Sequence, residues 1–148
     1  MKKLLYFAVI LTLLFSCAIK QSVIRNIDNN APVPQLKDNI FVFSEYAKDS
    51  RYGYNPEYPI NCFFKNSVND TINQQRFLNA LTGPKGEKLF FKKLESCCVF
   101  PTKNSEMGTG FLDVYEISYV GLAKPIKIYL NIYERGKLMV PIGLELKK

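Results

Sequence analysis

The chain of 148 residues contains no histidine, and this absence removes most of the catalytic chemistry open to a small protein. Ser-His-Asp and Cys-His nucleophile pairs, zinc sites of the HExxH type and imidazole general bases all need a side chain that titrates near neutrality. Carboxylates occur singly, and no spacing identifies two of them as general acid and base. We therefore expect a protein that is not an enzyme and that binds no cofactor. The carboxylates considered are Asp49, Glu57, Asp113, Glu116 and Glu134.

Cys62, Cys97 and Cys98 are the thiols that could react or pair in an oxidising compartment. A bridge between the two neighbours would hold their Cα atoms about 3.8 Å apart, below the usual disulfide range of about 4.4–6.8 Å. A disulfide from Cys62 to Cys97 or Cys98 is therefore favoured, and a chain without any bridge is the alternative. Three sulfurs from two segments, without a CxxC motif, do not predict a metal site.

Four tyrosines, Tyr46, Tyr52, Tyr54 and Tyr58, lie in or beside a segment rich in proline and glycine. Tyrosine combines a large apolar ring with a polar tip and is enriched where proteins bind partners. The four rings are therefore a candidate binding surface. The alternative is that they pin a long loop to the sheet.

The N-terminus reads as a secretory signal that ends in a lipidation site. Basic residues at positions 2 and 3 precede an apolar run over residues 4–15, which covers about 18 Å and is too short to span a hydrocarbon core of about 30 Å. The segment LFSC at residues 14–17 resembles the bacterial lipobox, in which the cysteine is acylated and becomes the new N-terminus. We expect residues 1–16 to be a lipoprotein signal peptide and Cys17 to be the lipidated residue, with an ordinary signal peptide as the alternative.

The residues after Cys17 indicate where the anchored protein resides. Ala18 follows the cysteine in place of aspartate, and this resembles the sorting rule in Gram-negative bacteria under which lipoproteins without that aspartate go to the outer membrane. The outer membrane is therefore favoured. No acidic pair resembling a surface-export signal follows, which favours the periplasmic face and leaves the cell surface open. The expected partners are membrane lipid through acylated Cys17, and an outer-membrane protein complex or an envelope glycan.

The charge balance gives no indication of a nucleic-acid partner. Removal of Lys2 and Lys3 with the signal leaves 20 − 2 = 18 basic residues against 13 acidic ones, a net charge of +5. This excess is mild, and no patterned basic and aromatic motif accompanies it.

The mature chain divides into a leader and one domain. Residues 17–39 are polar, contain several asparagines and prolines and show no period, which predicts a lipidated cysteine followed by a flexible tether. Residues 40–148 suffice for a single domain. Residues 40–46, 60–64, 88–95 and 111–120 are predicted strands, and a short amphipathic helix is predicted from Asp70 or Thr71 to Leu81.

The C-terminal third alternates most regularly. Residues 126–133 place aliphatic side chains on one face, the sequence ERGK at residues 134–137 is a turn signal, and residues 138–146 alternate again. This pattern predicts a C-terminal β-hairpin. The expected fold class is α+β, with a mostly antiparallel sheet of five to six strands packed by one short helix.

Several sequence motifs resemble those of a family of short lipoproteins common in Bacteroidota. The motifs are RFLNAL at residues 76–81, Gly83-Pro84 with Gly86, and SCC at residues 96–98. The resemblance covers residues 51–144. Some relatives carry the label 2-dehydro-3-deoxyphosphooctonate aldolase, which implies a barrel of eight βα units that this chain is too short to form. Asp70-Thr71-Ile72 also fits the Bacteroidota O-glycosylation pattern, which makes Thr71 a candidate glycosylation site.

These observations together favour a non-enzymatic outer-membrane lipoprotein that acts as an accessory or binding module in the cell envelope. One alternative is a small envelope enzyme that acts on glycan or peptide through carboxylates or a thiol. Another alternative is a structural surface component.

Overall fold

The computed structural model describes residues 21–63 and 70–148. These residues form eight strands and one helix. The helix is α2 (Asp70–Leu78). The strands are β1 (Gln35–Lys37), β2 (Ile40–Val42), β3 (Ile60–Asn61), β4 (Leu81–Thr82), β5 (Phe90–Pro101), β6 (Thr109–Ser118), β7 (Ile126–Asn131) and β8 (Glu145–Leu146).

The largest sheet has four strands in the order β3-β7-β6-β5. β5, β6 and β7 are antiparallel neighbours, whereas β3 joins β7 in parallel. Two short antiparallel ribbons, β1-β2 and β4-β8, complete the set. Asp38 and Asn39 connect β1 to β2, and both have positive φ (53° and 60°), as the central residues of a type I′ hairpin turn require.

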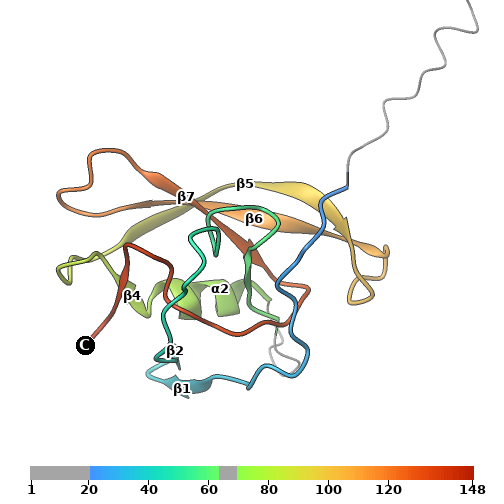
Figure 1. Cartoon of the computed structure of the whole chain (residues 1–148), viewed down its shortest axis with the longest axis horizontal. Coiled ribbons are helices and arrows are strands. Elements are labelled where there is room, and N and C mark those ends of the chain that lie inside the picture. Colours follow the sequence, from blue (N-terminus) through green and yellow to red (C-terminus); the bar gives the residue numbers. More distant parts are fainter. Residues whose placement is uncertain (1–20, 64–69) are drawn as a thin grey trace, which may run out of the picture.

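The helix α2 covers one face of the large sheet. Figure 1 shows β5, β6 and β7 as one layer, α2 beneath it, and the β1-β2 ribbon farther from the sheet. Phe77 and Leu78 project from α2 into a core that includes Ile117 of β6 and Ile128 of β7, all fully buried. Burial of side chains of this size stabilises the fold by about 1.5–3 kcal/mol each, which fixes the helix against the sheet.

The architecture is mostly β-sheet with one short helix, which agrees with the α+β class. The predicted C-terminal hairpin is wrong, because residues 138–146 form no ladder with β7. Val140 instead makes a parallel bridge with Tyr46, and β8 pairs with β4. The predicted alternation holds in part, since Leu138, Val140 and Leu144 are buried but Ile142 is exposed, and the partner is a different part of the chain.

The prediction of a flexible tether is wrong for residues 21–39. The Ser22 amide donates a hydrogen bond of 2.8 Å to the Val99 carbonyl. The Arg25 amide donates one of the same length to the Glu57 carbonyl, and Ala31 is buried. The folded domain therefore includes this segment from about residue 21. The signal peptide and Cys17 lie outside the described residues.

Within the part of the chain that the structure describes, no helix is both long and apolar enough to cross a bilayer.

Candidate functional site

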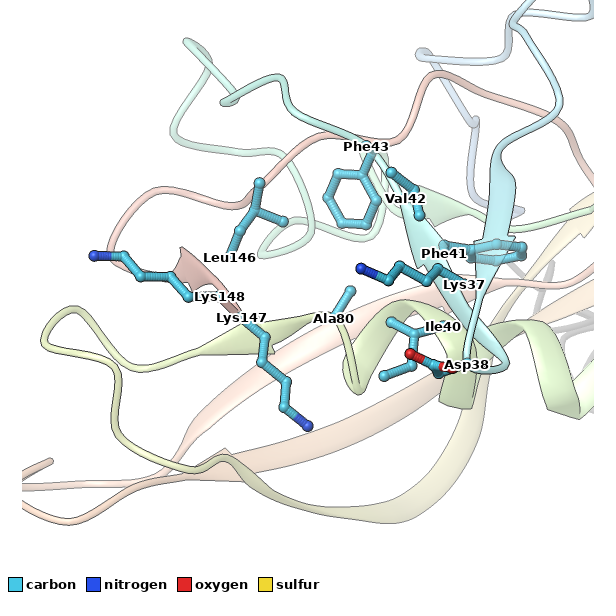
Figure 2. Close-up of a pocket in the computed structure, with 10 residues that line it drawn as sticks. All are labelled: Lys37, Asp38, Ile40, Phe41, Val42, Phe43, Ala80, Leu146, Lys147 and Lys148. Atoms are coloured by element: carbon cyan, nitrogen blue, oxygen red, sulfur yellow. The ribbon is translucent and has the colours of Figure 1, made fainter.

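A groove opens between β2 and the C-terminal residues, beside the end of α2 (Figure 2). It has a volume of about 390 Å³, and we call it the terminal groove. The type I′ turn positions one wall, and the β4-β8 ladder positions the other. The Lys147 amide donates to the Ala80 carbonyl at 2.8 Å, which holds the C-terminal segment beside the helix end. The lining residues are Lys37, Asp38, Ile40, Phe41, Val42, Phe43, Ala80, Leu146, Lys147 and Lys148.

The terminal groove has apolar walls and a basic rim. Phe43 faces Leu146 across the opening (Figure 2), and Ile40 and Val42 line the same side of the groove as Phe43. Three lysines and one aspartate border it, and Lys37 extends from β1 across the opening. Sites for small molecules are typically concave, mostly apolar and about 300–1,000 Å³, with a few polar groups that set orientation. The arrangement suits a molecule with an apolar body and a negative head group.

A buried polar cluster connects α2 to the sheet. Gln74 donates from Nε2 to Oδ2 of Asp113 at 2.9 Å, and the Tyr115 hydroxyl donates to Oε1 of Gln74 at 2.9 Å. Ser96 Oγ donates to Oδ1 of Asp113 at 2.6 Å, and Lys93 Nζ lies 2.6 Å from the same oxygen. Burial is the main cause of the raised pKa of Tyr115, with Asp113 adding to it. Both oxygens of the carboxylate have partners, so the cluster holds α2 to β6 and β5.

A second polar recess, of about 750 Å³, lies beside the turn between β5 and β6. Thr102 Oγ1 donates to Oε1 of the buried Glu134 at 2.5 Å. Asn104 donates from its side-chain amide to the Tyr133 carbonyl at 2.7 Å. These groups satisfy one another, and most residues that line the recess are polar, whereas most that line the terminal groove are apolar.

The four candidate tyrosines do not form one surface. Tyr46 is 48% exposed and donates to Oε2 of Glu145 at 2.6 Å, whereas Tyr52 is 3% exposed. The Tyr52 hydroxyl accepts a hydrogen bond from the Met139 amide at 3.1 Å. The Tyr54 hydroxyl donates to the Ile142 carbonyl at 2.8 Å, and burial raises its pKa to about 12. Tyr52 and Tyr54 therefore fit the alternative interpretation, in which the rings pin the loop rather than form a binding surface. They fasten the loop to residues 138–142.

Tyr58 lies under a charged group within the same loop. The Arg51 guanidinium lies 3.9 Å from the centroid of the Tyr58 ring. Arg51 also forms a bidentate pair with Asp49, and these hydrogen bonds lower the pKa of that carboxyl to about 2. The ring is engaged within the loop.

The predicted disulfide from Cys62 is wrong. The structure joins Cys97 to Cys98 and leaves Cys62 as a buried free thiol. Cys62 follows β3, and two strands separate β3 from β5, so the spacing is about 14 Å at about 4.8 Å per strand. A disulfide needs Cα atoms within about 7 Å. Burial raises the pKa of the Cys62 thiol, which keeps it protonated and unreactive.

The neighbouring cysteines are bridged at a β-bulge in β5. The β5-β6 register shifts between Cys97 and Phe100, and Cys98 has a φ of 59°. The Cα atoms of the two cysteines lie 3.8 Å apart, below the usual range as expected, and the bridge nevertheless forms. It does so with Cys98 in the left-handed conformation.

Two predicted modification sites remain, Thr71 within the described residues and Cys17 outside them. Thr71 is an exposed residue in the first turn of α2. Among residues 21–63 and 70–148, no three His, Cys, Asp or Glu side chains are grouped as metal ligands.

Sequence reasoning missed the terminal groove because it did not predict the β1-β2 hairpin, whose first strand lies in the segment assigned to the tether, or its position beside the C-terminal residues. Asp38-Asn39 between the apolar residues Leu36 and Ile40 is a hairpin signal that could have revealed it, since Asp and Asn adopt positive φ more readily than other side chains. The contribution of Leu146 and Lys147 depends on long-range pairing with β4.

A scan against protein-family models, a search of curated proteins and a search of solved structures each found no match for this chain. The resemblance to Bacteroidota lipoproteins therefore stays a prediction.

Proposed function

We propose that the protein is a non-enzymatic, lipid-anchored binding module on the periplasmic face of the bacterial outer membrane, and that its terminal groove holds an anionic amphipathic ligand. The carrying observation is the composition of this groove, in which apolar walls meet three lysines and one aspartate. The protein is further proposed to belong to the Bacteroidota lipoproteins that the words RFLNAL and SCC resemble.

The apolar walls of the groove would hold the apolar body of the ligand, and its basic rim would hold the negative head group. Burial of an alkyl chain against Ile40, Val42 and Leu146 contributes about 0.8 kcal/mol per methylene group. A carboxylate or phosphate beside Lys37 and Lys147 gains charge-assisted hydrogen bonds. Because the lysines lie at an open rim, salt should weaken this second contribution.

The position of the groove fits an anchored protein. Figure 1 shows the start of the described chain beside the end of β5, at the opposite end of the molecule from the β1-β2 ribbon and the C-terminus. Residues 17–20 span at most about 14 Å when extended. With Cys17 acylated, the groove would open away from the bilayer, toward ligands in the periplasm.

The geometry favours binding of an amphiphile over the other functions considered. An envelope glycan would need exposed aromatic rings for stacking, and the groove offers the half-buried Phe43. A thiol enzyme would need a reactive free cysteine, whereas Cys62 is buried and Cys98 is bonded. A protein complex of the envelope and a surface structural role remain as outcomes of the tests below.

Calorimetry with decanoate tests the ligand class. We expect decanoate to bind, and decyl maltoside and decyltrimethylammonium to bind at least tenfold more weakly, because they lack the negative head group. Lys37→Glu and Lys147→Glu should each weaken decanoate binding at least tenfold. Lys92→Glu, on the exposed part of β5, is the matched control and should leave it unchanged. Equal affinity for the three amphiphiles, or an equal loss in Lys92→Glu, would contradict the proposal.

Fractionation of cells tests the anchor independently. Cys17→Ala should move the protein from the membrane fraction to the soluble fraction, and the intact mass of the wild-type chain should lack residues 1–16 and carry acyl groups. Persistence of Cys17→Ala in the membrane would contradict lipid anchoring. The native mass in mild detergent distinguishes a lone module from a subunit of a larger complex, and protease treatment of intact cells should leave a periplasmic domain uncut.

A further inference from the structure

The Cys97–Cys98 disulfide is poorly suited to a purely structural role. A disulfide stabilises a fold mainly by restricting the unfolded chain, and the effect grows with the length of the loop that it closes. This bridge has a sequence separation of 1, so it closes the smallest loop possible. Its effect on the unfolded chain is correspondingly small.

One cysteine of the bridge, Cys98, has a backbone conformation that residues with a side chain rarely adopt. Cys98 has a φ of 59°, in the left-handed region. Among the described residues only Asp38 and Asn39 share this property without being glycine, and both serve the β1-β2 turn. Left-handed residues without a turn role cluster at functional sites. Once the bond is opened, Cys98 can return to the extended conformation of the strand.

The bridge is also reachable from solvent. Both cysteines are half-buried, and β5 is an edge strand of the four-stranded sheet. Exposed or strained disulfides are the labile ones in thiol exchange. Cys62 cannot take part, because it is buried and two strands, β7 and β6, lie between β3 and β5.

A change at this bridge would reach the N-terminal segment directly. The bulge places Cys98 and Val99 opposite Phe111 alone, and the Val99 carbonyl accepts the hydrogen bond from the Ser22 amide at 2.8 Å. Cys98 directly precedes Val99, so a change in the backbone of Cys98 on reduction would reorient the Val99 carbonyl that Ser22 contacts. Ser22 lies five positions after Cys17, at the point where the proposed anchor segment joins the domain.

The geometry points to a redox site: Cys97–Cys98 exchanges with a dithiol reductant of the envelope, and its reduction releases the N-terminal segment from β5 at Ser22. One thiolate of the dithiol attacks a sulfur of the pair, which breaks the Cys97–Cys98 bond and forms a mixed disulfide. The second thiolate of the dithiol breaks the mixed disulfide. The dithiol leaves as a disulfide, and its two protons and two electrons remain on the thiols of Cys97 and Cys98.

Alkylation and hydrogen exchange on the full chain in detergent, with dithiothreitol as the probe, test this inference. We expect iodoacetamide to label Cys97 and Cys98 but not Cys62 in the folded, reduced protein. Exchange of the Ser22 amide should accelerate at least tenfold on reduction, whereas that of Tyr129 in β7 should not change. Cys62→Ser should behave as the wild type. The double variant Cys97→Ser/Cys98→Ser should show fast Ser22 exchange without reductant.

Three results would overturn the inference. The first is a pair that stays unlabelled until the domain unfolds. The second is labelling of the pair with no change at Ser22. The third is equal acceleration at Ser22 and Tyr129, which would make the bridge a structural element. Because the wild type is tested with reductant, the result does not depend on the double variant folding, and it is independent of ligand binding in the terminal groove.

Discussion

Gln74 of α2 donates a hydrogen bond of 2.9 Å from its side-chain amide to Asp113 of β6, and both side chains are buried. The other end of the Gln74 amide accepts from the Tyr115 hydroxyl. One side chain thus satisfies a buried carboxylate and a buried phenol at once, across the contact between the helix and the sheet. Buried polar groups without partners are costly, so this contact has a measurable consequence.

Gln74→Leu should lower the free energy of unfolding by about 2 kcal/mol, because it leaves an Asp113 oxygen and the Tyr115 hydroxyl buried without these partners. Urea denaturation measures the loss. Gln75→Leu, at the exposed neighbouring position, is the matched control and should change stability by less than about 0.5 kcal/mol. Equal losses in the two variants would show that the hydrogen bonds of Gln74 do not matter.

The burial of Tyr54 should make the fold sensitive to alkali. Burial raises the pKa of Tyr54 from 10.0 to about 12, so the folded state keeps its phenolic proton at pH values where the unfolded state has lost it. The contribution is fully present below pH 10 and is lost as the pH rises from 10 to 12. Tyr54→Phe should be less stable than the wild type at pH 7, because it loses the hydrogen bond to Ile142, and the gap should narrow above pH 10. Urea midpoints at pH 7, 9, 10 and 11 measure this gap; a constant gap would contradict the assignment.

Alanine substitutions at Gly53 and Gly121 distinguish the cost of backbone strain from the cost of steric conflict. Both have positive φ, of 79° and 94°, so an alanine at either position should cost about 1–2 kcal/mol in backbone strain. A Cβ at Gly53 would lie 3.1 Å from Ile60 Cδ1 and 3.2 Å from Ile128 Cγ1, whereas a Cβ at Gly121 would meet nothing within 4 Å. Gly53→Ala should therefore have a free energy of unfolding about 1–3 kcal/mol lower than Gly121→Ala, which is the usual cost of overpacking a core. Thermal and urea unfolding check the order; equal losses would mean that the core yields freely around Gly53.

Local patterns predicted the centre of the fold. The apolar stripe that includes Phe77 and Leu78 predicted α2, and alternation predicted β6 and β7, because these elements bury one face against each other. The same rule misplaced residues 138–146. Alternation reports that Leu138, Val140 and Leu144 face the interior, but it does not report whether the neighbouring strand is β7, or Tyr46 and β4.

The functional features depended on contacts that no local pattern encodes. Residues 21–39 look like a tether by composition, yet backbone hydrogen bonds to distant residues tie them to the domain. Two residues of this segment, Lys37 and Asp38, line the terminal groove. The disulfide depended on a single left-handed residue, Cys98, at a bulge. The tyrosines looked alike in sequence, and only the packing of Tyr52 against residues 137–139 separates it from Tyr46.

Methyl NMR on the full chain, titrated with decanoate, tests the central claim most directly, because it locates the bound ligand. The account predicts saturable shifts in the methyl groups of Ile40, Val42, Ala80 and Leu146, which line the terminal groove, and no shifts at Ile128 in the core. Shifts confined to another part of the surface, or no saturable shifts at all, would contradict it.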